Sequence, residues 1–311
     1  MQLRNQTLVT EFLLLGLTSD AKTQVLLFLL FLVIYLITLS GNCLIIAVVY
    51  VDSQLQTPMY FFLSNLSFLD MCYTTIIVPK MLVNFLSQKK TISFVGCAGQ
   101  ILASLFLGET ECILLAVMAW DRYTAICNPL HYSVIMNKKA CHHMAAGAWV
   151  CGLMISMVDV VFTFHLPFCG PNIINHFFCE VPALLRLACT DTYVNEVVIF
   201  VVCVITLVVP FSLIIFTYVY IIATVVRIPS TTRQSRTFST CASHLMVVML
   251  FYGTAIFMYM RPRESYSPEK DKMVSVFYTV ITPMLNPIIY SLRNNEVKRA
   301  LKKVRCLKTF T

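Results

Sequence analysis

Seven long apolar stretches limit what this chain can fold into more than any other feature of its sequence. A helix needs roughly 20 apolar residues to cross the hydrocarbon core of a bilayer, and each stretch is long enough. We expect spanning helices at residues 24–50, 58–86, 94–127, 141–166, 195–226, 237–260 and 272–292. Of the 311 residues, 58% are hydrophobic and only 12% charged, which excludes a soluble globular domain. The sequence therefore predicts an all-α membrane protein, a bundle of seven transmembrane helices.

The chain divides into three parts around these stretches. Residues 1–23 form an extracellular N-terminal segment, residues 24–292 the seven-helix bundle, and residues 293–311 a cytoplasmic tail. In the tail, basic residues alternate with apolar residues at helical spacing, namely Val297, Ala300, Leu301 and Val304. This pattern predicts an amphipathic helix on the inner membrane surface. The basic residues indicate anionic membrane lipid as a partner, and no nucleic acid.

The distribution of charge predicts that the N-terminus lies outside the cell. With this orientation the inner loops and tail hold 13 basic and three acidic residues, whereas the outer side holds ten and eight. An excess of Lys and Arg on the cytoplasmic side is the usual bias of membrane proteins. Asn5-Gln6-Thr7 is a glycosylation sequon, which fits an outer N-terminal segment. We expect a multi-pass protein of the plasma membrane, glycosylated at Asn5.

Four of the 13 cysteines fall on the outer side of this arrangement. They are Cys97, at the top of the third span, and Cys169, Cys179 and Cys189, between the fourth and fifth spans. An even number of cysteines in an oxidising compartment predicts two disulfides. Their spacing alone allows three connectivities.

Two short strings place strongly polar residues inside the spans. MAWDRY, at residues 118–123, contains Arg122, and NPIIY, at residues 286–290, begins with Asn286. Polar groups at such depth are functional candidates by default. For Arg122 the alternative is a side chain that extends to the membrane interface, and we expect it at the inner surface.

These strings, together with Asp70, resemble those of rhodopsin-like G-protein-coupled receptors. Longer strings are similar to those of olfactory receptors of the land-vertebrate group: PMYFFLSNLSFLD at residues 58–70, AICNPLHY at 125–132, FSTCASHL at 238–245 and PMLNPIIYSLRN at 283–294. The resemblance runs from about Asn5 to Lys303. Trp120 stands where the family usually has tyrosine, a departure that bears on basal activity.

The resemblance implies a receptor that binds small volatile odorants and activates a heterotrimeric G protein of the stimulatory olfactory type, which raises cyclic AMP. It also implies the pairings Cys97–Cys179 and Cys169–Cys189. Residues that the resemblance assigns to activation and G-protein coupling are Asp121, Arg122, Tyr123, Tyr218, His244, Asn286, Pro287 and Tyr290. No acidic residue stands at the base of the sixth helix to hold Arg122, so Asp121, Tyr218 or His244 must restrain it.

A ligand pocket is likewise implied, with an apolar lining and a few hydroxyl groups, as is usual for small-ligand cavities. The matching positions are Ser104, Leu105, Gly108, Val202, Cys203, Thr206, Tyr252, Ala255, Ile256, Tyr259, Val276 and Thr279. Each of these residues alone fits ordinary helix packing equally well. Since none of them is basic or acidic, we expect a neutral, largely apolar ligand.

Two groups of polar residues in the spans leave alternatives open. The resemblance places Asn42, Asp70, Glu111 and Asn286 at one level of the bundle, where two carboxyl groups cannot both stay bare and ionised. They either share a proton within a hydrogen-bond network or bind a sodium ion; no other cofactor is expected. Glu109 lies roughly 200° around the helix from Glu111, just below the expected pocket. Whether Glu109 pairs with Asp159 is open.

Other classes of function leave different sequence features. A transporter or channel, the second hypothesis, predicts inverted repeats or paired broken helices, and the sequence has neither. We do not expect an enzyme, because no nucleophile–base motif or metal-ligand pattern appears. His176 and Glu180 flank Cys179, but one histidine and one glutamate are a poor set of ligands for a transition metal.

Overall fold

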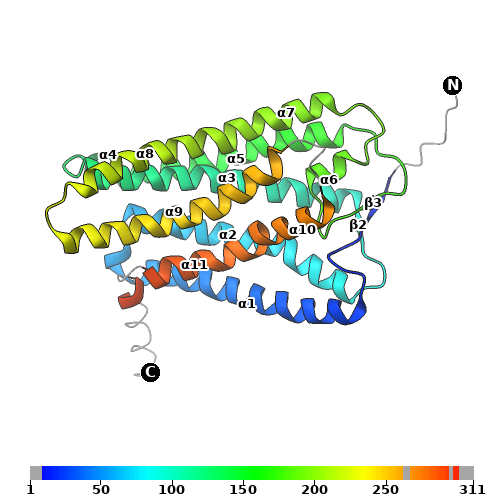
Figure 1. The fold of residues 1–311 in the computed structure, drawn as a ribbon, viewed down its shortest axis with the longest axis horizontal. Helices are drawn as coiled ribbons and strands as arrows, with labels where there is room; N and C mark the ends of the chain where they lie inside the picture. Colours follow the sequence, from blue (N-terminus) through cyan, green and yellow to red (C-terminus); the bar gives the residue numbers. More distant parts are fainter. Residues whose placement is uncertain (1–8, 262–266, 294–296, 301–311) are drawn as a thin grey trace.

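The computed structural model describes residues 9–261, 267–293 and 297–300. Within these residues, seven helical segments are long and apolar enough to cross a membrane, and they pack as one bundle (Figure 1). The first four spans are α1 (Ala21–Val51), α2 (Pro58–Leu86), α3 (Phe94–Cys127) and α5 (Lys138–Phe164). The fifth runs through α7 (Tyr193–Cys203), η2 (Val204–Val208) and α8 (Val209–Val226), the sixth is α9 (Thr231–Tyr259), and the seventh runs through α10 (Pro268–Val276), η4 (Phe277–Ile281) and α11 (Thr282–Arg293). The seven-helix fold is confirmed. The predicted span boundaries differ by at most four residues, except that α9 begins six residues before the predicted start of the sixth span.

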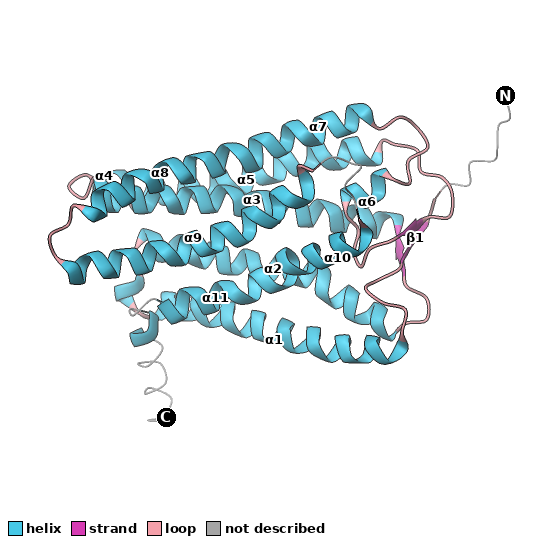
Figure 2. Cartoon of the chain, in the orientation of Figure 1, coloured by secondary structure: helices cyan, strands magenta, loops and turns pink. Residues whose placement is uncertain are grey.

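Short elements lie at both ends of the bundle (Figure 2). One end carries the strands β1 (Glu11–Leu14), β2 (Thr91–Ser93) and β3 (Ile173–Ile174) and the helix α6 (Val181–Leu185). We call this the sheet end. The opposite end carries η1 (Ser53–Leu55) and α4 (Tyr132–Ile135), and we call it the α4 end.

The small sheet fixes the start of the described chain against the bundle. The central strand β1 pairs antiparallel with β2 and parallel with β3. Its side chains alternate, so that Phe12 and Leu14 are buried. The Phe12 ring lies 6.0 Å from the rings of both Phe94 and Phe168. No strand was predicted for this segment from the sequence.

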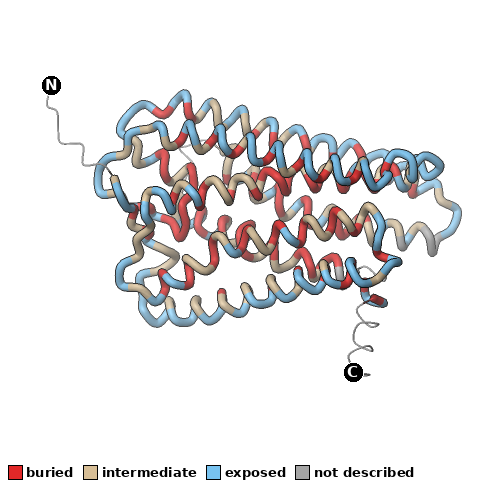
Figure 3. The backbone as a smooth tube through the Cα atoms, turned by 180° about the vertical axis from the view of Figure 1, so that it is seen from behind, coloured by how far each residue is buried: buried red, intermediate tan, exposed pale blue. Residues whose placement is uncertain are grey.

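Burial in the bundle is arranged as expected for a protein in a lipid environment. Buried segments gather where the helices face one another, and the outward faces are exposed (Figure 3). Those outward faces are apolar; Leu26, Val95 and Val219 are between 60% and 78% exposed. Large apolar surfaces on every side would be a liability in water. Together with the length of the helices, they identify a multi-pass membrane protein.

Two spans contain a five-residue π-helical segment directly before a proline. η2 ends at Val208, two residues before Pro210, and η4 ends at Ile281, two residues before Pro283. Proline has no backbone N–H and its ring clashes with the preceding turn. A locally widened helix is one way to accommodate this, and such segments occur often at functional sites. In the seventh span the widened turn changes which side chains are directed inward.

A close contact between α3 and α5 depends on Gly152. A Cβ atom at this position would lie 3.0 Å from the carbonyl oxygen of Phe106 and 3.0 Å from the backbone nitrogen of Thr110. Any side chain here would therefore push the two helices apart. The contact holds α3 and α5 together two turns below Asp159.

Some sequence predictions fall partly or wholly outside the described residues. The glycosylation site at Asn5 is one, and so are Leu301 and Val304 of the expected amphipathic helix. Residues 297–300 are helical, with Val297 and Ala300 buried. The amphipathic helix over the rest of the tail stays a prediction.

Candidate functional site

A cavity lies in the sheet-end half of the bundle. Its lining is mainly apolar, as is usual for small-ligand sites. Eight of the twelve residues expected for the pocket line it: Ser104, Leu105, Gly108, Val202, Cys203, Thr206, Ala255 and Tyr259. The structure thus brings together positions from the third, fifth and sixth spans.

The other four expected residues do not line this cavity. Tyr252 is fully buried, and its hydroxyl donates to the carbonyl oxygen of Cys112 at 2.8 Å. The Thr279 hydroxyl donates to the carbonyl oxygen of Ser275. Ile256 and Val276 are half-buried outside the lining. In the seventh span, Tyr278 of the π-helical turn η4 lines the cavity instead. A π-helical turn contains an extra residue, and the sequence does not reveal where such a turn occurs.

The cavity also has lining residues that the carried-over pocket lacked. They are Tyr73, Glu109, Cys112, Asp159, Val181, Ile199, Leu207, Phe251 and Tyr278. Glu109 and Asp159 are the acidic residues among them, and each is at most 6% exposed. Val181 belongs to the long loop between α5 and α7. Its position two residues after Cys179 was a usable signal, because the expected disulfide brings that loop over the third helix.

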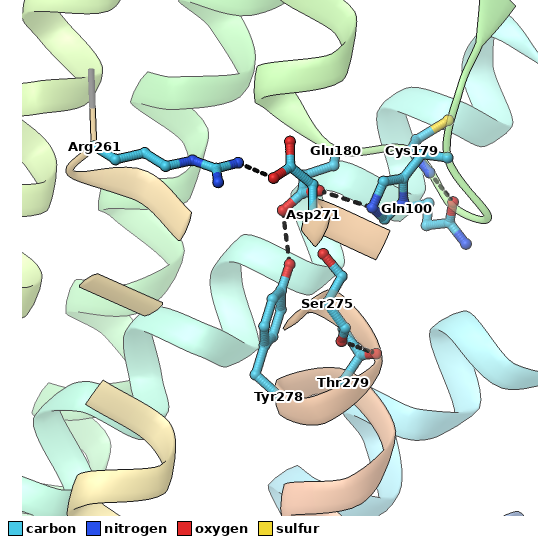
Figure 4. Close-up of polar contacts among 9 residues, drawn as sticks. Gln100, Cys179, Glu180, Arg261, Asp271, Ser275, Tyr278 and Thr279 are labelled. Atoms are coloured by element: carbon cyan, nitrogen blue, oxygen red, sulfur yellow. Dashed lines mark hydrogen bonds and ion pairs between the residues drawn. The ribbon is translucent and has the colours of Figure 1, made fainter. Parts of the chain in front are cut away.

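The long loop of residues 165–192 is tied down over the cavity. Cys179 is disulfide-bonded to Cys97 at the start of α3, and Cys169 to Cys189 within the loop. These are the pairings that the resemblance implied. The backbone N–H of Cys179 also donates to Gln100 Oε1 at 2.9 Å (Figure 4). The loop is therefore fixed to α3 by one covalent and one polar contact at the same point.

Glu180 joins this loop to the seventh span. Its Oε1 accepts a hydrogen bond from the Tyr278 hydroxyl at 2.7 Å (Figure 4). Its Oε2 lies 3.3 Å from Nε2 of His176. Burial raises the pKa of Glu180 to about 7, although the hydrogen bond from Tyr278 opposes the shift. Burial, with a further contribution from the charge of Lys272, lowers the pKa of His176 to about 3.

Beside this contact, Arg261 and Asp271 form an ion pair between the ends of α9 and α10 (Figure 4). Both side chains are at most 9% exposed. No group of three or more metal-ligating side chains occurs in the described part of the chain. The His176 ring stacks on Phe177 with centroids 4.7 Å apart, and Glu180 accepts the hydrogen bond of Tyr278.

Deeper in the bundle, Asp70 and Asn286 are in direct contact. Asn286 Nδ2 donates to both carboxylate oxygens of Asp70, at 3.2 and 3.0 Å. Glu111 interacts electrostatically with Asp70. Asn42 Nδ2 donates to the carbonyl oxygen of Pro283, one turn before Asn286. Three side-chain oxygens of this group have no hydrogen-bond partner: Asn42 Oδ1, Glu111 Oε1 and Asn286 Oδ1.

At the α4 end, Arg122 holds the third span to the sixth. Its Nη1 donates to the carbonyl oxygen of Thr240 on α9, and the Tyr218 hydroxyl is also hydrogen-bonded to it. Tyr218 in turn bonds His244 Nδ1 at 2.8 Å. Of the three expected restraints, Tyr218 contacts Arg122 directly and His244 acts through Tyr218. The Thr240 carbonyl could not be foreseen, since a backbone acceptor leaves no sequence signal.

The remaining residues of this region lie around Arg122. Asp121 accepts a hydrogen bond from the Tyr132 hydroxyl of α4 at 2.8 Å. The Tyr123 ring stacks on Trp120 with centroids 5.3 Å apart. Tyr290 borders a space of about 300 Å³ beside Arg122.

Arg122 was expected at the inner surface, but it is 4% exposed, because α9 packs over it; that expectation is wrong. Pro287 lies inside α11 and packs against α1, where a Cβ on Gly41 would lie 3.1 Å from its ring.

Comparison with known proteins agrees with this architecture. The sequence model of the family described as "Olfactory receptor" matches residues 31–308. The chain is 54% identical to olfactory receptor 10A7 and 56% identical to olfactory receptor 2D2, both from Homo sapiens. These alignments cover 96% of this chain and 95% and 97% of the two relatives. Olfactory receptor-like protein OLF3 from Canis lupus familiaris is 52% identical, over 96% of this chain and 95% of its own length. The chain therefore belongs to the olfactory receptor family, whose members are G-protein-coupled receptors and not enzymes.

Proposed function

We propose that this chain is an odorant receptor of the plasma membrane, with its sheet end and N-terminus outside the cell and Asn5 glycosylated. It binds small, mostly neutral, apolar volatile molecules in the cavity between α3 and the fifth and sixth spans. Binding activates a heterotrimeric G protein of the stimulatory olfactory type at the α4 end, and cyclic AMP rises. The transporter or channel hypothesis has no feature of the described residues in its favour.

One observation carries this proposal. The sixth span, α9, lines the cavity through Phe251, Ala255 and Tyr259 and accepts the hydrogen bond of Arg122 at Thr240. A single helix thus connects the ligand site to the coupling site. A ligand that binds better when α9 has moved shifts the population toward that arrangement.

Tyr252 is placed to transmit this shift. It lies on α9 next to Phe251, a cavity residue, and its hydroxyl bonds the Cys112 carbonyl on α3. Its ring lies 5.4 Å from that of Phe211 on α8. Rotation of α9 would break the bond to α3, so Tyr252 is a pivot between the cavity and the α4 end.

The Asp70 group is proposed to stabilise the resting arrangement. Its unpaired oxygens and the two carboxyl groups are the hard oxygen donors that a sodium ion takes, and they would suit a shared proton equally. A sodium ion bound there would be held by Asp70, Glu111, Asn42 and Asn286. Measuring receptor thermal stability while sodium is replaced by a large organic cation, at fixed ionic strength, decides between the two.

The test of the function is a cyclic-AMP response to a screen of volatile compounds, in cells that express the chain. Arg122→Ala should abolish the response, because the residue proposed to contact the G protein is lost. Surface labelling must show equal delivery of both proteins. A normal response from the Arg122→Ala protein at equal surface density would overturn the coupling role. Ion or solute flux without cyclic AMP would favour a transporter or channel.

A further inference from the structure

Two acidic residues from neighbouring helices lie next to each other in the wall of the cavity. Glu109 of α3 and Asp159 of α5 both line it, and they are 6% and 4% exposed. Their carboxyl groups are hydrogen-bonded to each other. The close contact of α3 and α5 at Gly152 keeps the two helices near enough for this pairing.

The hydrogen bond between the two groups determines what the remaining oxygens can do. Two carboxyl groups can bond each other only if a proton lies between them. That proton occupies one oxygen of each group. With this single proton shared by the pair, the other two oxygens, Glu109 Oε2 and Asp159 Oδ1, which have no hydrogen-bond partner, are left as acceptors. The Glu109 carboxyl also bonds a backbone group of Ser156.

Nothing else on the cavity wall supplies a charge of opposite sign. None of the described residues that line the cavity is basic. The Thr206 hydroxyl donates to the carbonyl oxygen of Val202 at 2.9 Å, and the Ser104 hydroxyl to that of Ile101 at 3.1 Å. A buried acceptor without a donor is energetically costly. A ligand that donates a hydrogen bond to Glu109 Oε2 or Asp159 Oδ1 is therefore favoured in this cavity.

We propose that the Glu109–Asp159 pair anchors the ligand by accepting a hydrogen bond from its hydroxyl group, so that the receptor selects small alcohols over ethers of the same size. This rests on the proposed function, in which the cavity is the ligand site. A bare ether oxygen would bring a further acceptor to oxygens that already lack a donor. An ammonium group would also donate, but it would have to leave water for a mainly apolar cavity, a cost that buried ion pairs often fail to repay.

The test uses pairs of isomers that differ in the donor alone: octanol with methoxyheptane, cyclohexylmethanol with methoxycyclohexane, and benzyl alcohol with anisole. Each compound is assayed twice. One measurement is the cyclic-AMP response of cells, and the other is the thermal stability of the purified full-length receptor with the compound present. Each alcohol should act at a concentration about tenfold or more below that of its ether.

Variants then test whether the Glu109–Asp159 pair causes the preference for alcohols over ethers. Removing one acid leaves the other buried and unpaired, whereas replacing both by apolar residues of similar size can be nearly neutral. The double variant Glu109→Met, Asp159→Leu should lose the preference, so that each alcohol and its ether act within about threefold of each other. Ser156→Ala is the matched control. It lies one turn from Asp159, its hydroxyl already donates to the Leu153 carbonyl, and the preference should persist.

The outcomes are distinct. Three results obtained with the unmodified receptor alone would overturn the anchor. They are equal potency of alcohols and ethers, no binding of any alcohol, and greater potency of octylamine than of octanol. A preference that persists in the double variant also overturns it. Alcohol-specific stabilisation of the purified receptor without cyclic AMP supports the anchor and contradicts the proposed function. Cyclic-AMP responses to alcohols and ethers alike support that function and contradict the anchor.

Discussion

The two ends of the helix bundle are held together by different kinds of interaction. At the sheet end, two disulfides, a three-stranded sheet and the buried ion pair of Arg261 and Asp271 connect the long loop, the N-terminal strand and the last two spans. At the α4 end, side-chain hydrogen bonds hold α9 to its neighbours, chiefly Arg122 to Thr240 and Tyr218 to His244.

This difference indicates which end moves. A net hydrogen bond contributes about 0.5–1.5 kcal/mol, whereas a disulfide typically contributes about 2–4 kcal/mol. An end held by a few hydrogen bonds can therefore separate at a cost that a ligand's preference for one arrangement can offset. The fixed end keeps the cavity in shape while the other end opens.

The largest effect is expected from breaking the covalent tie at the sheet end. Cys179→Ala removes the link between the long loop and α3, and with it the anchor for Glu180 and Val181. We expect surface delivery to fall below detection, measured by labelling intact cells. Cys151→Ala, an exposed cysteine of α5 without a disulfide, should be delivered normally.

Peptide mapping of the unmodified protein checks the pairing itself. Cys97 joined to Cys169, or found as a free thiol, would contradict the arrangement of the loop. Normal delivery of the Cys179→Ala protein would show that the sheet end does not depend on this disulfide.

A smaller effect is expected from weakening the α4 end. Tyr218→Phe keeps the ring but removes the hydroxyl that bonds His244 and Arg122. Losing either hydrogen bond should shift the equilibrium between arrangements about 2- to 10-fold, so basal cyclic AMP should rise at least several-fold when both are lost. Tyr220→Phe is the control, since its ring contacts with Tyr123 and Phe216 remain. Unchanged or lower basal signalling at equal surface density would mean that Tyr218 does not restrain the resting arrangement.

The smallest effect is a change in how stability at the sheet end depends on pH. The pKa of Glu180 is raised from 4.5 to about 7, chiefly by burial, so its contribution to stability is lost as pH rises from about 4.5 to 7. The pKa of His176 is lowered from 6.5 to about 3, again chiefly by burial, so its contribution is lost as pH falls below about 6.5. Between pH 4.5 and 6.5 the two slopes oppose each other.

We therefore expect the melting temperature of the purified receptor to change little over this window. Glu180→Gln removes one of the two slopes, and its melting temperature should rise from pH 4.5 to 6.5. If the melting temperature of the Glu180→Gln protein also stays constant over this window, Glu180 and His176 do not titrate as their burial requires. Asp271, Arg261 and Lys272 face the same region and are present in both proteins.

Most of the fold could be predicted because it depends on long apolar stretches and local strings. The span at residues 94–127 was placed to the residue, since its boundaries coincide with a change from polar to apolar sequence. Eight pocket residues of the third, fifth and sixth spans could be carried over because the register of these helices is preserved at the cavity. Val276 and Thr279, before Pro283 in the seventh span, could not, because the π-helical turn η4 is a local response to packing that hydrophobic periodicity does not reveal.

Some contacts between segments distant in the sequence could not be predicted either. The pairing of β1 with β2 and β3 joins three short segments from separate parts of the chain, and each alone is too short to give a pattern. The bond between Glu109 and Asp159 depends on the close approach of α3 and α5 at Gly152. The Arg122 contact uses a backbone carbonyl of Thr240, which any residue would supply.

The most direct test measures the movement of both ends in one protein. Spin labels are attached through unnatural amino acids at Leu130 and Phe238 for the α4 end, and at Val95 and Met273 for the sheet end, all four of which are exposed. Distances within each pair are measured on purified receptor alone and with an activating alcohol and the G protein. We expect the α4-end distance to lengthen by several ångströms while the sheet-end distance stays constant. An α4-end distance that does not change while the G protein is activated, or an equal change at both ends, would contradict this account.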